Sequence, residues 1–186
     1  MTCSGPNRGS SLTLTEAEAP AEAVLTLAPT LTDSFRTAMR GVASAVYLLT
    51  TRGPEGDAGM TATAACSLSF DPVSVLICVN RTTSFIRTLE ASGRFALNIL
   101  SRDDAEVAKA FGSPAGRPHR FVLGEWYDLD GMPALSSSLS TIVCDVASQM
   151  DFGSHRVFVG QVRHVDNREG RPELVYCQGA FRTLEA

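Results

Sequence analysis

Apolar residues recur along the chain in short alternating or continuous runs, and most of these runs have the spacing of strands. Runs rich in β-branched and aromatic residues predict strands at 45–51, 73–79, 94–100, 139–150, 156–165 and 174–176, with a further edge segment at 179–184. Helical spacing predicts three helices, which begin at Thr32 or Asp33, at Phe85, and at Asp103 or Asp104. Because the strands come as hairpins with helices inserted between them, the pattern favours a mainly β fold, an antiparallel barrel with peripheral helices.

A further predicted strand, from Met60 to Leu68, is unusual because nearly all of its side chains are small. A strand that only had to fill a core would favour larger β-branched or aromatic side chains. Small residues allow another object to approach the backbone, and close packing against a second strand or subunit is the alternative. The Asp71-Pro72 pair then turns the chain back, so that the end of the next strand could lie near the first.

The residues after the strand at 73–79 form a polar tip, Asn80-Arg81-Thr82-Thr83-Ser84, directly before a predicted helix. Hydroxyl groups and unpaired backbone N–H groups at a helix start can bind an anion, and Arg81 could add a fork of donors. A simple helix cap by Thr82 or Thr83 is the alternative interpretation, and the two roles are compatible.

The composition places these elements in one globular domain. Residues 1–30 are rich in Ser, Thr, Ala, Glu, Pro and Gly and are predicted to form a mobile tail, with a short helical piece near 16–24, so that the domain spans 31–186. The content of 44% hydrophobic and 19% charged residues is typical of soluble globular proteins. The net charge of −4 argues against nucleic-acid binding, and the absence of a long apolar run or a signal-like start predicts a cytoplasmic protein that does not enter a membrane.

The chemistry-bearing residues exclude several mechanisms. Five cysteines occur without a Cys-x-x-Cys pair, which predicts buried, reduced thiols and no metal site. The sequence has no Gly-x-Ser-x-Gly elbow, no phosphate loop of nucleoside triphosphatases and no Gly-x-Gly-x-x-Gly fingerprint. Asp103 and Asp104 open a helix and are interpreted as its cap. A binding platform remains, which suits a cofactor that carries its own chemistry, such as a flavin lying on the strand of small residues.

His155 stands alone in the turn Gly153-Ser154-His155 between two predicted strands. A single histidine in a hairpin turn is more often a surface residue or one that stabilises the turn. The functional interpretation makes His155 a contact for a second substrate that arrives over the face of the flavin.

Several segments resemble the flavin reductase-like family, the small reductase components of two-component flavin monooxygenases. The similarity lies in 59–69 (GMTATAACSLS), the Asp71-Pro72 turn and 76–80 (LICVN), and continues in 93–100, 111–112, 153–155, 157–162 and 174–176. It covers about 35–181. Ser154 is a departure, because many members carry Gly-Asp-His in this turn.

The resemblance implies an FMN-binding split β-barrel, usually a homodimer, that reduces free FMN or FAD with NADH or NADPH and supplies a separate flavin-dependent monooxygenase. Hydride transfer from nicotinamide C4 to flavin N5 depends on stacking, so no catalytic acid or base is expected. The residues implied in cofactor binding are Met60, Thr61, Ala62, Thr63 and Ala64 at the isoalloxazine, Asn80, Arg81, Thr82, Thr83 and Ser84 at the ribityl phosphate, Phe111 near the distal part of the flavin, and Ser154 with His155, which would help to place the nicotinamide.

Three other functions are weighed against this one. A non-catalytic flavin- or haem-binding module of the same barrel class, a carrier or sensor, would retain flavin tightly without oxidising NADH. A pyridoxamine-phosphate-oxidase-like enzyme would need a further basic pocket for its substrate, and no second cluster of Arg or Lys stands out. A structural interaction protein would leave the small-residue strand and the polar tip without a purpose.

Overall fold

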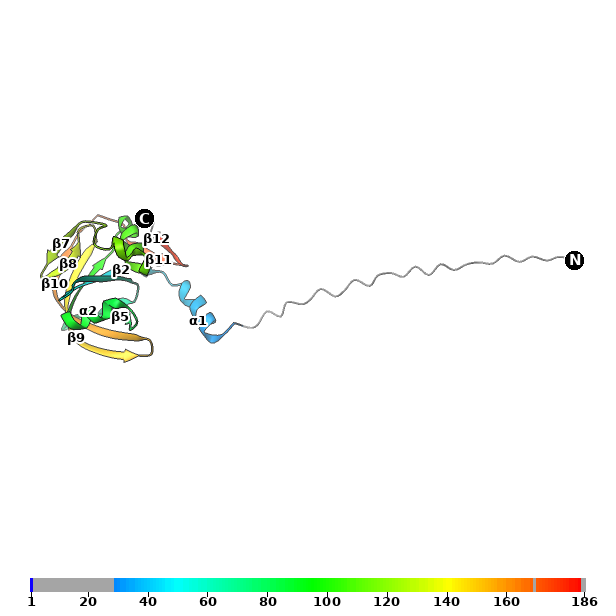
Figure 1. Cartoon of the computed structure of the whole chain (residues 1–186), viewed down its shortest axis with the longest axis horizontal. Helices are drawn as coiled ribbons and strands as arrows, with labels where there is room; N and C mark the ends of the chain where they lie inside the picture. The colour runs from blue at the N-terminus through cyan, green and yellow to red at the C-terminus, as the bar shows by residue number, and fades with distance from the viewer. Residues whose placement is uncertain (2–28, 169, 185–186) are drawn as a thin grey trace.

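The computed structural model describes residues 1, 29–168 and 170–184, and Figure 1 shows a body made mainly of strands preceded by one helix, α1. The mainly β fold expected from the sequence is confirmed. The helices are α1 (Leu31–Arg40), α2 (Ser84–Ser92), α3 (Ala105–Gly112) and the 3₁₀ segments η1 (Arg102–Asp104) and η2 (Pro114–His119). The strands are β1 (Ser44–Ala45), β2 (Tyr47–Gly53), β3 (Gly56–Ala62), β4 (Ala65–Phe70), β5 (Val73–Asn80), β6 (Arg94–Ile99), β7 (Trp126–Leu129), β8 (Met132–Leu135), β9 (Ser140–Phe152), β10 (His155–Asn167), β11 (Leu174–Cys177) and β12 (Ala180–Thr183).

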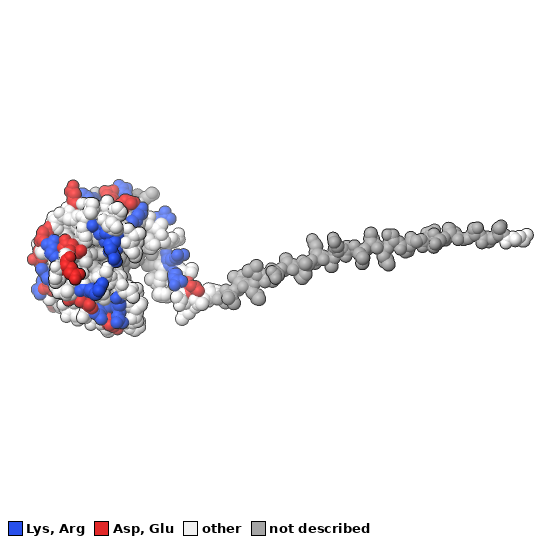
Figure 2. Space-filling model, viewed as in Figure 1, with Lys and Arg blue, Asp and Glu red and all other residues white. Residues whose placement is uncertain are grey.

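The expected tail and its helical piece lie outside the described residues, apart from Met1, Pro29 and Thr30. Within the described part, no helix is long and apolar enough to cross a membrane. Positive and negative side chains are interspersed over the face of the molecule seen in Figure 2. The boundary of the domain near Leu31 stays a prediction.

The largest sheet has seven strands in the order β3-β2-β6-β9-β10-β5-β4, and its two edge strands are consecutive in the chain. In a flat sheet these edges would lie roughly 29 Å apart, at about 4.8 Å per strand. However, Ala62 and Ala65 are joined only through Thr63 and Ala64, a path that spans at most about 11 Å. The sheet must therefore curl until its edges approach each other at a seam. The Cys78 N–H donates to the Ala64 carbonyl oxygen, 2.9 Å away, and this bond extends the pairing of β4 with β5 into the link.

The single strand predicted from Met60 to Leu68 is wrong, because the chain breaks at Thr63-Ala64 into β3 and β4. β3 pairs with β2, whereas β4 pairs with β5 at the far edge of the sheet. A run of small residues has no alternation of apolar and polar side chains that would mark an inward and an outward face. The sequence pattern therefore does not show where the strand breaks. The predicted hairpin between β2 and β3 is present and closes at Gly53 and Gly56.

The hydrophobic interior has two main parts. One lies inside the curled sheet, where α2 contributes Phe85, Ile86 and Leu89 beside Phe95 and Phe158. The other lies under α3, where Val107 and Phe111 meet Val46, Leu48 and Leu135. The second part holds α3 against the outer side of the seam, and that contact positions the site described below.

A buried polar cluster joins the strands between these two parts. The Asn98 amide on β6 donates to the Leu48 carbonyl (3.0 Å) and to the Thr50 hydroxyl (3.2 Å). Its carbonyl oxygen accepts from the Leu135 N–H and from the Thr141 hydroxyl, each at 3.0 Å. One fully buried side chain therefore ties β2, β6, β8 and β9 together.

Other local expectations differ from the structure. The cap of α1 is Thr30, whose hydroxyl accepts from the Asp33 N–H, in place of the predicted Thr32 or Asp33. The hairpin of β7 and β8 was not predicted. The cap of the helix at 102–104 is Ser101, in place of the predicted Asp103 and Asp104, and Asp104 completes a capping box by accepting from the Ser101 N–H at 2.8 Å.

The four cysteines of the described part are free thiols, but they are not all buried as predicted. Cys144 is buried, and burial together with the charge of Asp145 raises the pKa of its thiol to about 12. Cys66 is exposed because β4 is an edge strand of the sheet.

Replacing Asn98 by Ala is expected to lower the free energy of unfolding by about 2–4 kcal/mol, because it leaves buried donors and acceptors unpaired. Asn167, an exposed residue that accepts one hydrogen bond from Ser140, provides the matched control, and Asn167→Ala should cost less than about 0.5 kcal/mol. Urea unfolding measures both variants. Equal midpoints for the two variants would contradict the structural role of the Asn98 cluster.

Candidate functional site

Two connected pockets open at the seam of the sheet. The wide pocket has a volume of about 870 Å³ and the narrow pocket about 270 Å³, and both include Thr61, Gly112 and Ser113 in their walls. The wide pocket is lined by Val46, Thr61, Ala62, Thr63, Ala105, Ala108, Lys109, Gly112, Ser113, Tyr176, Gly179, Ala180 and Phe181. The narrow pocket is lined by Gly59, Met60, Thr61, Thr82, Thr83, Ser84, Phe85, Phe111, Gly112, Ser113, Pro114, Arg117 and Arg120.

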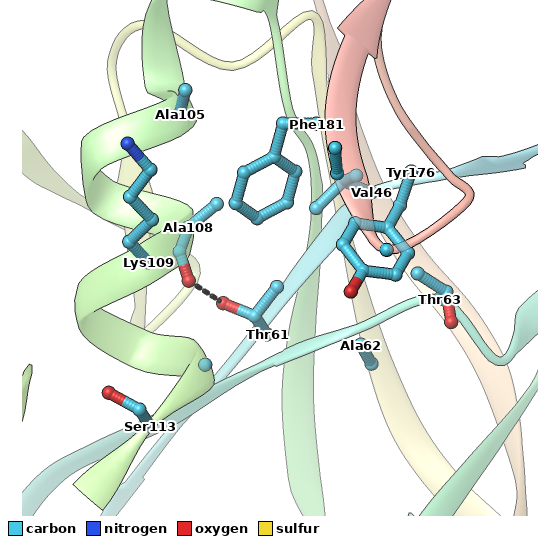
Figure 3. A pocket seen from close by; sticks show the side chains of 13 residues that line it. Val46, Thr61, Ala62, Thr63, Ala105, Ala108, Lys109, Ser113, Tyr176 and Phe181 are labelled. Carbon is cyan, nitrogen blue, oxygen red and sulfur yellow. Dashed lines mark hydrogen bonds between the residues drawn. The ribbon is translucent and has the colours of Figure 1, made fainter. Parts of the chain in front are cut away.

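The wide pocket lies between α3 on one side and the β11–β12 hairpin on the other, with the end of β3 beneath (Figure 3). The Thr61 hydroxyl donates to the Ala108 carbonyl at 2.7 Å, which holds β3 against α3. Tyr176 and Phe181 form an edge-to-face pair, with ring centroids 5.4 Å apart, on the opposite wall. Small side chains below and aromatic rings beside the opening suit a flat ring system.

Charge is sparse in the wide pocket. Among the residues that the structure describes, Lys109 is the one charged residue that lines it, and its ammonium pairs with Glu106 on the exposed side of α3 at 2.6 Å. Within the same residues, no carboxylate or histidine lines it. The wide pocket therefore offers mainly shape and hydrogen bonds.

The narrow pocket is electropositive, because Arg117 and Arg120 both line it. Neither guanidinium has an ion-pair partner within the part of the chain that the structure describes. Burial, followed by the charge of Arg117, lowers the pKa of Arg120. The sequence analysis did not single out these two arginines, and their arrangement favours an anion between them.

The two arginines differ in their bonding. Arg120 donates to the carbonyls of Ala110, Phe111 and Ser113 at 3.0–3.1 Å and to that of Gly59 at 3.3 Å, so it closes the C-terminal end of α3 onto β3. Arg117 has one long contact, 3.4 Å from its Nη2 to the Ser84 hydroxyl. Arg117 is therefore the cation with donors available to a ligand.

The polar tip is organised around Asn80. Its side-chain oxygen accepts from the Thr82 N–H (3.0 Å) and hydroxyl (2.9 Å), and its carbonyl accepts from the Thr83 hydroxyl (2.9 Å). Thr83 occupies the N-cap position of α2, but no side-chain hydrogen bond caps this helix. The alternative of capping by a Thr82 or Thr83 side chain is therefore wrong, and the N–H groups of the first turn are left for another acceptor.

Gly59 explains how Phe111 reaches the narrow pocket. A Cβ at position 59 would lie 2.7 Å from the Phe111 ring and 3.0 Å from the Leu49 carbonyl oxygen. The ring of Phe111 is buried and packs edge-to-face on Phe121, with centroids 5.0 Å apart. Only glycine allows this aromatic side chain to lie directly against β3.

The structure brings eight of the predicted site residues together and leaves five aside. Those that line the two pockets are Met60, Thr61, Ala62, Thr63, Thr82, Thr83, Ser84 and Phe111. Those that line neither pocket are Ala64, Asn80, Arg81, Ser154 and His155. Their roles in binding stay predictions.

The His155 turn lies beside the polar tip. His155 is opposite Asn80 across β10 and β5, and the Arg81 N–H donates to the Ser154 carbonyl at 3.0 Å. The Ser154 hydroxyl lies 2.9 Å from His155 Nδ1. Arg81, predicted to bind phosphate, has its guanidinium 3.6 Å from Asp151.

Residues that the sequence did not single out complete both pockets: Lys109, Ser113, Arg117, Arg120, Tyr176 and Phe181. A signal was present for Arg120, since basic residues just after a helix often bind its terminal carbonyls. Tyr176 was predicted only as part of a core strand.

Residues 39–185 match the model of the flavin reductase like domain. The chain belongs to this family. The FMN reductase (NADH) RutF of Pseudomonas syringae is 34% identical over 163 residues, which cover 87% of this chain and 92% of the relative. The 4-hydroxyphenylacetate 3-monooxygenase reductase component of Pseudomonas aeruginosa is 33% identical, over 82% of this chain and 91% of the relative. The crystal structure of BorF, the flavin reductase component of a bacterial two-component tryptophan halogenase, has a TM-score of 0.77 at 28% identity and covers 83% of this chain and 99% of BorF.

Proposed function

We propose that this protein is an NAD(P)H:flavin oxidoreductase that reduces FMN or FAD and releases it to a separate flavin-dependent monooxygenase. The observation that carries the proposal is the joined pair of pockets in a chain of the flavin reductase-like family. A wide pocket with small and aromatic walls opens directly into a narrow pocket with two arginines that form no ion pair within the described residues. A flavin has the same two parts, a flat ring and a phosphorylated tail.

The residues present fit such a ligand. Thr61, Ala62 and Thr63 leave room for a ring against the backbone of the seam, and Ser113 lies where the pockets join. Arg117 and the hydroxyls of Thr82 and Ser84 surround the narrow pocket, next to the first turn of α2. A flavin phosphate in this pocket would gain charged hydrogen bonds, and the charge between Arg117 and Arg120 would be offset.

The same residues define what the protein contributes to the reaction. A bound flavin supplies the chemistry, acceptance of a hydride at N5 from the nicotinamide C4. The side chains of the wide pocket orient the two rings and limit water between them. Orientation of this kind can remove roughly 7–11 kcal/mol of a bimolecular barrier, so a pocket without a carboxylate or histidine among its described lining residues is compatible with fast turnover.

The class of partner is inferred from the names of the relatives. Two of them are named as reductase components, one of a 4-hydroxyphenylacetate 3-monooxygenase and one of a tryptophan halogenase. A reductase of this kind works with a second protein that consumes the reduced flavin. We extend that role to this chain, with a cytoplasmic location where NADH is available.

The homodimer expected from the resemblance is part of the proposal. Around the β4–β5 turn, Phe70 is 86% exposed, and at the β9–β10 tip Phe152 is 80% exposed. Exposed aromatic side chains on strand edges are typical of contact surfaces. Sedimentation velocity should give twice the chain mass of 19.8 kDa, and Phe70→Asp should shift the protein toward the monomer. A monomer at micromolar concentration would contradict this assembly.

The activity is tested by mixing the purified protein with NADH or NADPH and adding FMN, FAD or riboflavin in turn. We expect the absorbance of the nicotinamide band to fall only when a flavin is present. Tight flavin binding without turnover, with any of the three flavins and either nicotinamide, would favour a carrier or sensor and reject the reductase.

Arg117 and His155 provide a matched pair of variants. Arg117→Gln should raise the dissociation constant for FMN by roughly tenfold or more, which is the effect of one lost charged hydrogen bond. It should leave riboflavin binding unchanged, because riboflavin lacks the phosphate. An equal loss of FMN and riboflavin binding in this variant would refute the phosphate site.

His155→Ala should raise the KM for NADH and preserve flavin affinity. An unchanged KM and kcat for NADH in His155→Ala would refute the nicotinamide role of this residue.

A further inference from the structure

The β9–β10 hairpin carries the His155 turn at its tip and projects from the sheet. β6 pairs with β9 from Ser140 to Asp145, so beyond Asp145 the sole strand neighbour of β9 within the described residues is β10. Figure 1 shows this hairpin, in yellow and orange, extending below α2. A projecting pair of strands is held by few contacts, so the position of His155 depends on what fixes the tip.

The residues next to the turn are divided between the two faces of the hairpin. Arg156 lies opposite Asp151 on β9 and opposite Val79 on β5, and Val79 is fully buried inside the curled sheet. Because directly paired residues share a face of a sheet, Arg156 and Asp151 lie on the inner face. His155 precedes Arg156 in the strand and therefore lies on the outer face, opposite Asn80 of the polar tip.

Arg156 joins the inner face of the hairpin to α2. Its guanidinium forms an ion pair with Glu90 of α2 through Nη1. It also binds both carboxylate oxygens of Asp151, through Nε and, at 2.9 Å, through Nη2. The Arg156 side chain is only 20% exposed, so solvent and salt screen these pairs less than they screen pairs at the surface.

The same series of charges reaches the polar tip. The Asp151 carboxylate lies 3.6 Å from the Arg81 guanidinium, and the Arg81 N–H donates to the Ser154 carbonyl at 3.0 Å. Four alternating charges therefore link α2, the hairpin and the polar tip, in the order Glu90, Arg156, Asp151 and Arg81. Since Arg156 uses its donors on two carboxylates, its role is to hold these elements together.

We propose that Arg156 is a positioning residue for the reductase reaction and that it acts by fixing His155. The inference rests on the proposed function, in which His155 contacts the nicotinamide. The ion pair with Glu90 holds the inner face of the hairpin against α2, and His155 on the opposite face is thereby held beside the polar tip. Without this pair the tip can shift relative to α2, and a displacement of about 1 Å is enough to weaken the effect of a positioned group.

The test measures the KM and kcat for NADH and the dissociation constant for FMN in Arg156→Gln and Glu90→Ala. Each variant should raise the KM for NADH about threefold to fivefold, the ratio that corresponds to one partly exposed ion pair, with kcat and FMN binding unchanged. Arg163→Gln is the matched control, since Arg163 lies on the same strand, pairs with Asp145 at 2.7 Å and lines neither pocket of the candidate site. It should change none of these values. An unchanged KM for NADH in Arg156→Gln would overturn the proposal.

A double-mutant cycle separates positioning from a general effect on the structure. In the His155→Ala background, Arg156→Gln should cause no further rise in the KM for NADH, because the residue through which it acts is absent. Rises that multiply in the double variant would overturn the positioning role. Sedimentation velocity adds a second check, because loss of the dimer in Arg156→Gln would assign the ion pair to subunit assembly and reject the proposal.

The same measurements distinguish this inference from the proposed function. Failure of the reductase activity would be seen as no NADH oxidation by the wild-type protein with any flavin. A raised KM for NADH in His155→Ala together with an unchanged KM in both Arg156→Gln and Glu90→Ala would reject the positioning role alone.

Discussion

The two-residue link between β3 and β4 is the constraint on which the rest of the structure depends. Because Thr63 and Ala64 must connect opposite edges of a seven-stranded sheet, the sheet has to curl, and the curl creates a seam. Helix α3 and the β11–β12 hairpin lie on either side of the end of β3 at this seam, and the wide pocket is the space between them. The small side chains that make the tight link possible also leave its backbone open to a ligand.

Around the seam, residues that hold the fold together lie next to residues whose polar groups are available to a ligand. Arg120 uses its donors on the carbonyls at the end of α3, and in doing so it places Arg117 at the narrow pocket. Thr61 similarly uses its hydroxyl to hold β3 against α3. Loss of Arg120 or Thr61 would therefore disturb the packing of the pocket walls. Arg117 and Ser84 have no comparable structural role among the described contacts.

The sequence was sufficient to predict the strands that have long runs of apolar residues. Strand β6 has a continuous apolar run that is buried through its middle, and strands β9 and β10 carry apolar residues at most positions near the core. The break at Thr63 was not predictable, because a run of small residues does not show which side chains face the core. The short η2 segment has no periodicity, and the position of Arg117 near Ser84 depends on contacts between residues far apart in the chain. The exposure of Tyr176 likewise depends on how β11 pairs with β1.

The connection of the pockets separates the cationic part of the candidate site from its uncharged part. The narrow pocket joins the wide pocket through Thr61, Gly112 and Ser113. Arg117 lies in the narrow pocket, whereas the charge of Lys109 in the wide pocket is offset by its ion pair with Glu106. An anionic group is therefore favoured in the narrow pocket and an uncharged ring in the wide pocket, because the attraction between charges falls with distance.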